Sequence, residues 1–135
     1  MESLYLLFKA GGLYFMIPLE QVVSVESLAS ARAMEFPVYD FGQACHLYEK
    51  PVRAPYILIV RFNETKIGMA VEWVEDIRKT RKTAVHKLGK PVIGPDNQYL
   101  DSAVALEGLD LPLAYLLDMS ALFKKLADCS EAILE

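Results

Sequence analysis

Short hydrophobic runs, separated by turn-forming residues, recur along the chain at the spacing expected of β-strands. The clearest pair is 56–62 and 67–71, two apolar runs joined by a polar turn at 63–65. Both runs are continuous rather than alternating, which is typical of strands that are covered on both faces. Residues 73–78 alternate instead, and this pattern predicts a half-buried strand.

The beginning of the chain predicts a β-hairpin. Residues 4–9 and 13–17 are apolar and β-prone, and Gly11 and Gly12 lie between them. Two glycines supply the positive φ angles that a tight hairpin turn requires. Pro18 then ends the second strand, because proline cannot donate to a central ladder, and a short helical turn is expected to follow.

A short strand and a short helix are predicted in the next part of the chain. Residues 36–39 are β-prone, and Pro37 places them at the edge of a sheet. Asp40 follows, and its carboxylate can accept the free amide protons of a first helical turn. The expected helix reaches residue 47.

A third hairpin and a terminal helix are predicted near the end of the chain. Residues 100–106 and 111–117 are the two strands of this hairpin. Asp118 or Ser120 is expected to cap a helix over 119–127, which carries apolar residues at helical spacing.

These strands, joined by short turns, predict an all-β barrel or sandwich with minor helices. With 135 residues the chain fits one domain, and we expect an ordered core over about 4–126 and a tail over 128–135. No apolar run approaches the roughly 18 residues of a spanning helix, so direct membrane insertion is not expected.

Composition narrows the class of protein further. The net charge of −4 gives no basic excess, whereas nucleic-acid binders usually need one to neutralise phosphates. Met1-Glu2-Ser3 is acidic where a signal peptide would be basic, and Cys45 and Cys129 are too few for a disulfide framework. We therefore expect a cytoplasmic protein.

Candidate catalytic and metal-binding residues are sparse. His46 and His86 lie far apart in the sequence and lack the short spacings of a zinc site. No Gly-x-Ser-x-Gly elbow marks a nucleophile, and Asp40 and Asp118 are already explained as helix caps. We expect no enzyme activity, no metal and no cofactor; a small hydrolase is the enzymatic alternative.

A basic cluster at 78–82 is the most distinctive charged feature. It could bind phosphate or an acidic partner, but Glu72, Glu75 and Asp76 offset it and no aromatic residues alternate with its charges. We interpret the cluster as the solvated end of a strand. The alternative that stays open is a small β-barrel that binds nucleic acid through these residues.

The order of the motifs resembles the CheW-like domain family. A strand–glycine–strand hairpin leads into Pro-Leu-x-x-Val over 11–22, and a Pro-Val-x-Asp element with a short helix follows at 36–42. Residues 68–74 match Gly-x-x-Val-Asp-x-Val with Glu in place of Asp. A Leu-Asp cap enters the last helix at 117–122.

This resemblance implies two small intertwined SH3-like barrels of five strands each, which share a core and hold no catalytic centre. It also implies an adaptor in bacterial chemotaxis that joins the regulatory, CheW-like domain of a histidine kinase to the cytoplasmic tip of a chemoreceptor. The positions that match the family's docking step are Val22 and Val25, with Phe36 and Val38 as neighbours.

One departure from the family concerns the receptor. Residues 26–35 are shorter than the family's segment and lack its Gly-x-x-Asn-x-Arg-Gly motif, whose arginine is tied to receptor coupling. Arg32 is the nearest arginine, and Ser24 stands where the family has an acid. We therefore expect a divergent adaptor in which receptor binding is altered.

Overall fold

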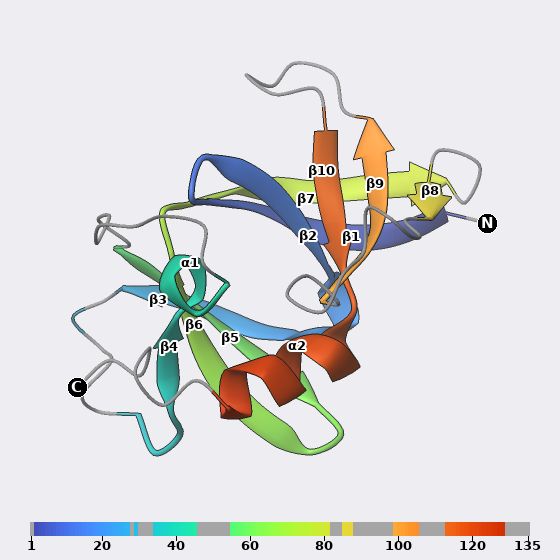
Figure 1. The fold of residues 1–135 in the computed structure, drawn as a ribbon. Helices are drawn as coiled ribbons and strands as arrows, with labels where there is room; N and C mark the ends of the chain where they lie inside the picture. Colours follow the sequence, from blue (N-terminus) through green and yellow to red (C-terminus); the bar gives the residue numbers. More distant parts are fainter. Residues whose placement is uncertain are drawn as a thin grey trace.

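The computed structural model describes residues 2–27, 29, 34–45, 55–81, 85–87, 99–105 and 113–128. Within these residues the chain forms a six-stranded sheet, a four-stranded sheet and two α-helices (Figure 1). The prediction of an all-β fold with short helices, one of them C-terminal, is confirmed. The described strands form one sheet of six and one of four, whereas two barrels of five strands each were expected. The larger sheet has six strands because the hydrogen-bonded pairing of strands continues from the first hairpin into the third.

The larger sheet is built on the predicted first and third hairpins. Its strands are β1 (Glu2–Ala10), β2 (Leu13–Pro18), β7 (Trp73–Arg81), β8 (Val85–Lys87), β9 (Leu100–Ala105) and β10 (Leu113–Leu117), in the order β7-β1-β2-β10-β9-β8. Gly11 and Gly12 turn the first hairpin with φ angles of 59° and 78°. β10 lies parallel to β2 and thereby joins the two hairpins.

The smaller sheet is built on the central hairpin. Its strands are β3 (Val22–Ser27), β4 (Val38–Asp40), β5 (Tyr56–Phe62) and β6 (Thr65–Val71), in the order β3-β5-β6-β4. Asn63 and Glu64 form the turn between β5 and β6, both with positive φ, as a hairpin turn of type I′ requires. β4 is an edge strand in the described sheet, as Pro37 predicted.

The chain passes twice between the sheets, which is how the two halves intertwine. It first leaves β2 through the short 3-10 helix η1 (Leu19–Gln21) and enters β3. It returns at Glu72, between β6 and β7. Glu72 ties this crossover to the first hairpin, because its Oε1 accepts a 2.7 Å hydrogen bond from the Gly11 amide and its own amide donates to the Lys9 carbonyl at 3.0 Å. This contact gives the acid of the Gly-x-x-Val-acid motif a structural role.

One hydrophobic core is shared by both sheets. Phe8 and Phe15 from the larger sheet meet Phe41 from helix α1 (Phe41–Ala44), with ring centroids 5.1 to 5.6 Å apart. Leu58 and Val60 face the same core from the smaller sheet. Each sheet therefore buries one face against the other sheet, while a smaller apolar cluster lies on the other face of each sheet.

The two helices begin where the acidic residues predict. Asp40 and Asp118 each accept a 3.1 Å hydrogen bond from the amide three positions later. Helix α1 ends at Ala44, earlier than expected, whereas α2 (Met119–Ala127) has the predicted bounds. Among the described residues no helix is long and apolar enough to cross a membrane.

Candidate functional site

The outer strand β3 carries two of the predicted docking residues. Val25 is 42% exposed, although its register partner on β5, Leu58, is fully buried. Val22 is half-buried and packs against the shared core, so its side chain also supports the fold. Because β3 is terminal in the described sheet, its outer backbone groups pair with no described strand, and such an edge is where a partner strand can add to a sheet.

An aromatic pair, a half-buried tyrosine and an exposed tryptophan, continues the apolar surface from Val25. Tyr56 is its diagonal neighbour, since Ser27 pairs with Tyr56 and Val25 with Leu58. The Tyr56 ring meets the Trp73 ring edge-on, with centroids 5.5 Å apart and planes at 87°. Trp73 is 49% exposed. We call Val25, Tyr56 and Trp73 the seam surface, because Trp73, at the start of β7 in the larger sheet, here meets Tyr56 of the smaller sheet.

The remaining predicted docking residues do not join the seam surface. Val38 is only 2% exposed and packs with Ile57 and Ile59 on the other face of the smaller sheet, so its side chain offers almost no surface to a partner. Phe36 is half-buried against the same cluster, and the Lys66 amine lies 5.5 Å from its ring centroid. Arg32 lies outside the described residues.

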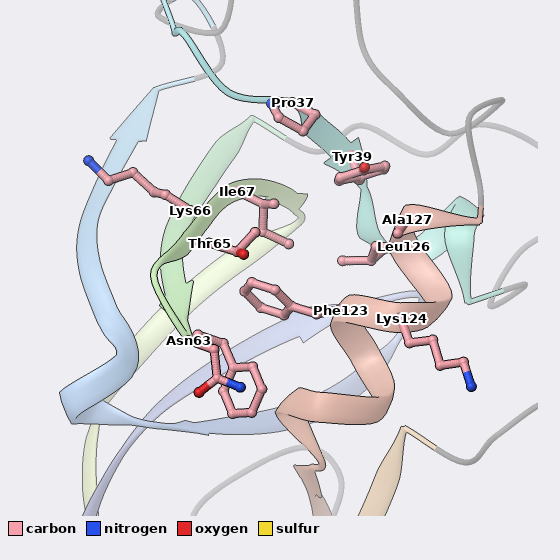
Figure 2. A pocket seen from close by; sticks show the side chains of 11 residues that line it. Pro37, Tyr39, Asn63, Thr65, Lys66, Ile67, Phe123, Lys124, Leu126 and Ala127 are labelled. Carbon is pink, nitrogen blue, oxygen red and sulfur yellow. The ribbon is translucent and has the colours of Figure 1, made fainter.

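A groove at the opposite end of the β5–β6 hairpin was not predicted from the sequence. Figure 2 shows it between the hairpin tip, β4 and helix α2, with Phe123 pointing towards Ile67. The Phe62 and Phe123 rings lie 5.6 Å apart, and the groove has a volume of about 390 Å³. No local pattern could reveal it, because its walls come from three segments far apart in the sequence.

The groove is apolar inside and basic at its rims. Lys66 and Lys124 line it from the hairpin and from α2, and both side chains extend outward in Figure 2. No carboxylate is among the described residues that line it. The groove therefore combines apolar walls with two positive charges at its rim.

The phenol of Tyr99 is buried next to the Cys45 thiol. Burial, together with the neighbouring Cys45 thiol, raises the pKa of Tyr99 well above its ordinary value, so this phenol stays protonated at neutral pH. No three His, Cys, Asp or Glu side chains gather as metal ligands in the part of the chain that the structure describes. His46, Lys82 and Cys129 lie outside that part.

Comparison with known proteins decides the family. The family model of the CheW-like domain matches residues 24–127, which is well over half of the chain.

The chain belongs to the CheW-like domain family.

A solved CheW-like structure shows the same fold. The scaffolding protein TtCheW from Thermoanaerobacter tengcongensis superimposes with a TM-score of 0.72, covering 92% of this chain and 94% of its own, at 15% sequence identity. A search of curated protein sequences gives no significant match. The resemblance of the motifs to the CheW-like family is thus confirmed.

Proposed function

We propose that this protein is a non-catalytic adaptor that joins the regulatory domain of a chemosensory histidine kinase to chemoreceptor tips in the cytoplasm. Membership of the CheW-like family supports a scaffold or adaptor role in chemotaxis signalling. The observation that carries the proposal is the presence of two separate apolar surfaces, the seam surface and the groove.

The positions of the two surfaces suit an adaptor. Tyr56 begins β5 at the seam surface, whereas Phe62 ends it at the groove. A seven-residue strand spans roughly 20 Å, so two partners could occupy the two surfaces without competing for the same side chains. Each surface offers apolar side chains that a folded partner can cover, which is how protein interfaces gain most of their affinity.

The seam surface is the proposed site of the kinase regulatory domain, because it contains Val25 of the family's docking step. Val25→Glu is the variant that tests it, since Val25 is exposed and a carboxylate there can stay hydrated in the free protein. Val22→Glu is less suitable, because Val22 packs against the core. In a calorimetric titration with the kinase domain we expect Val25→Glu to weaken binding at least tenfold, because the bound state would desolvate the added charge.

Leu113→Glu is the matched control. Leu113 is also 42% exposed but lies on β10 of the other sheet, so the same change there should leave binding unaltered. Circular dichroism checks that both variants fold. Equal affinity of wild type and Val25→Glu would remove the seam surface from the kinase interface.

The groove is the proposed site of the receptor tip. Lys124→Glu reverses a charge at its rim without touching the core, since Lys124 is exposed. We expect this variant to weaken receptor binding and to leave kinase binding intact. The shortened segment before β4 leads us to expect weaker receptor binding than in a family member with the Asn-x-Arg-Gly motif. Receptor binding as tight as in such a protein would contradict that expectation.

A further inference from the structure

Three basic side chains gather at the groove end of the β5–β6 hairpin. Arg61 and Lys66 occupy directly opposite positions on β5 and β6, and Lys124 lies on α2 at the other side of the groove. Arg61 and Lys124 are exposed, and Lys66 is half-buried. Opposite side chains of an antiparallel pair begin about 5 Å apart, so the two cations of the hairpin repel each other in the free protein.

No described carboxylate is paired with these cations. The Lys66 amine lies 5.5 Å from the centroid of the Phe36 ring, and the other two cations form no ion pair with a described residue. The nearest acids along the chain are Glu64 in the hairpin turn and Asp128 at the end of α2. Both are exposed, and neither lines the groove. They lower the net charge of this end of the molecule but leave its cations accessible to a partner.

The inside of the same groove is apolar. Ile67 and Leu126 line it as buried residues, at 5% and 1% exposure. Phe62 and Phe123 are half-buried, and Figure 2 shows the Phe123 ring pointing from α2 towards the hairpin. Rings in this state gain free energy when a partner covers their remaining surface, and the groove volume of about 390 Å³ gives room for a partner side chain.

The positions of the cations define where negative charge is needed. Phe62 and Ile67 face the groove, so their strand neighbours Arg61 and Lys66 face the opposite side of the hairpin. A segment that leaves the groove over the hairpin tip passes both of these cations, and a carboxylate placed there relieves their mutual repulsion. A segment that follows α2 passes Lys124 instead.

This arrangement selects the chemistry of the partner. Apolar side chains are needed to cover the groove, and carboxylates are the protein groups that pair with arginine and lysine. We propose that the groove binds an acidic, amphipathic partner segment, with an apolar side chain against Phe62 and Phe123 and carboxylates beside Lys66 and Lys124. The inference rests on the proposed function, because it specifies the chemistry by which the groove recognises the receptor tip.

A first test uses peptides and does not need the receptor. The probe is acetyl-Glu-Leu-Glu-Phe-Leu-Glu-amide, and matched versions carry glutamine or lysine in place of glutamate, or alanine in place of leucine and phenylalanine. In nitrogen-15 NMR spectra we expect the glutamate probe to shift the amide signals of Asn63 and Lys124 saturably, and high salt to weaken it. The three other peptides should bind more weakly or not at all. The indole signal of Trp73, the sole tryptophan, reports on the seam surface and should not move.

Charge variants of the protein locate the contact. Arg61→Gln and Lys124→Gln should each weaken binding of the glutamate peptide by roughly twofold to fivefold, the weight of an exposed ion pair. Lys125→Gln is the matched control, because it removes the same charge from the next position of α2. The Lys125 amine lies 5.8 Å from the centroid of the Tyr99 ring, and Lys125 does not line the groove. This control should bind the peptide as the wild type does.

Stability separates a binding role of Arg61 from a structural one. Because Arg61 and Lys66 repel each other in the free protein, Arg61→Gln should leave the midpoint of urea unfolding unchanged or raise it, while it weakens peptide binding. A variant that loses binding through damage to the fold would lower the midpoint as well. A lowered midpoint in Arg61→Gln would therefore contradict the proposed contact.

The outcomes separate this inference from the proposed function. Equal binding of the glutamate and glutamine peptides, or binding that ignores both Arg61→Gln and Lys124→Gln, overturns the inference; a receptor tip that still binds leaves the adaptor role standing. Glutamate-selective binding at the groove without binding of the receptor tip supports the inference and contradicts the assignment of the receptor to this site. Absence of binding by every peptide also overturns the inference.

Discussion

Replacing Gly68 by alanine tests how closely the smaller sheet is packed. Gly68 lies in the middle of β6, between Val38 on β4 and Ile59 on β5 in the register. A Cβ at this position would lie 3.0 Å from Cγ2 of Ile57 and 3.0 Å from Cγ2 of Val38. Both neighbours are buried, at 0% and 2% exposure, and hydrogen-bonded strands on either side limit any movement of the backbone.

The expected cost follows from these contacts. Inserting a methyl group into a well-packed core typically costs about 1 to 3 kcal/mol, and alanine's lower unfolded-state entropy returns roughly 0.4 to 1 kcal/mol. We therefore expect Gly68→Ala to lower the free energy of unfolding by about 1 to 2 kcal/mol. Urea unfolding followed by circular dichroism at 25 °C measures this directly.

A double-mutant cycle identifies the cause. Val38→Ala removes two of the three Cγ atoms that the new methyl group would approach and leaves the Cγ2 of Ile57. Gly68→Ala should therefore cost about 0.5 to 1 kcal/mol less in the Val38→Ala background than in the wild type. Gly12→Ala is the control, because a Cβ there meets nothing within 4 Å and its cost would come from the φ angle of 78°. The cost of Gly12→Ala should be the same in the wild-type and Val38→Ala backgrounds. A neutral Gly68→Ala, or strict additivity with Val38→Ala, would refute the packing argument.

Three further predictions concern the hydrogen bonds and titration of the fold. Glu72→Ala should lower the free energy of unfolding by about 2 kcal/mol, because the hydrogen bond from the Gly11 amide to a charged acceptor is lost. Glu72→Gln should lower it by less. Urea titrations in which Glu72→Ala is as stable as the wild type would contradict this role of the hydrogen bond. Asp118→Ala should cost about 1 kcal/mol by removing the cap on the Ala121 amide, whereas Asp118→Asn should retain most of the stability in the same assay. Burial raises the pKa of Tyr99, so the stabilisation that this difference from the unfolded chain provides is complete below the unfolded-state pKa of about 10 and is lost as the pH rises further. Tyr99→Phe should therefore flatten the fall in the free energy of unfolding above that pH. The same fall in wild type and Tyr99→Phe would argue against a raised pKa of Tyr99.

Local sequence patterns predicted the hairpins and helix caps because these depend on neighbouring residues. Gly11 and Gly12 fix a turn by their own φ angles, and Asp118 caps the helix that follows it. The parallel pairing of β10 with β2 was beyond such reasoning, since it joins strands about a hundred residues apart. The division into sheets of six and four strands follows from that pairing.

The candidate site, like the fold, could be predicted from the sequence only in part. Val25 could be placed from its motif, and the structure shows it exposed beside Tyr56 and Trp73. Val38 belongs to a neighbouring motif, but its strand turns the side chain towards Gly68 and away from solvent. The groove needs the meeting of the β5–β6 hairpin, β4 and α2, and no pattern within one of these segments indicates that they meet.

The most direct test of the adaptor role is the formation of a ternary complex. The kinase regulatory domain and a receptor tip from the same organism are mixed with and without this protein, and the complexes are separated by size-exclusion chromatography with light scattering. We predict that the two partners elute together only when the protein is present, and that Val25→Glu releases the kinase domain while Lys124→Glu releases the receptor tip. If each partner binds the folded protein but one displaces the other, the two surfaces are not independent and the proposed adaptor mechanism is wrong.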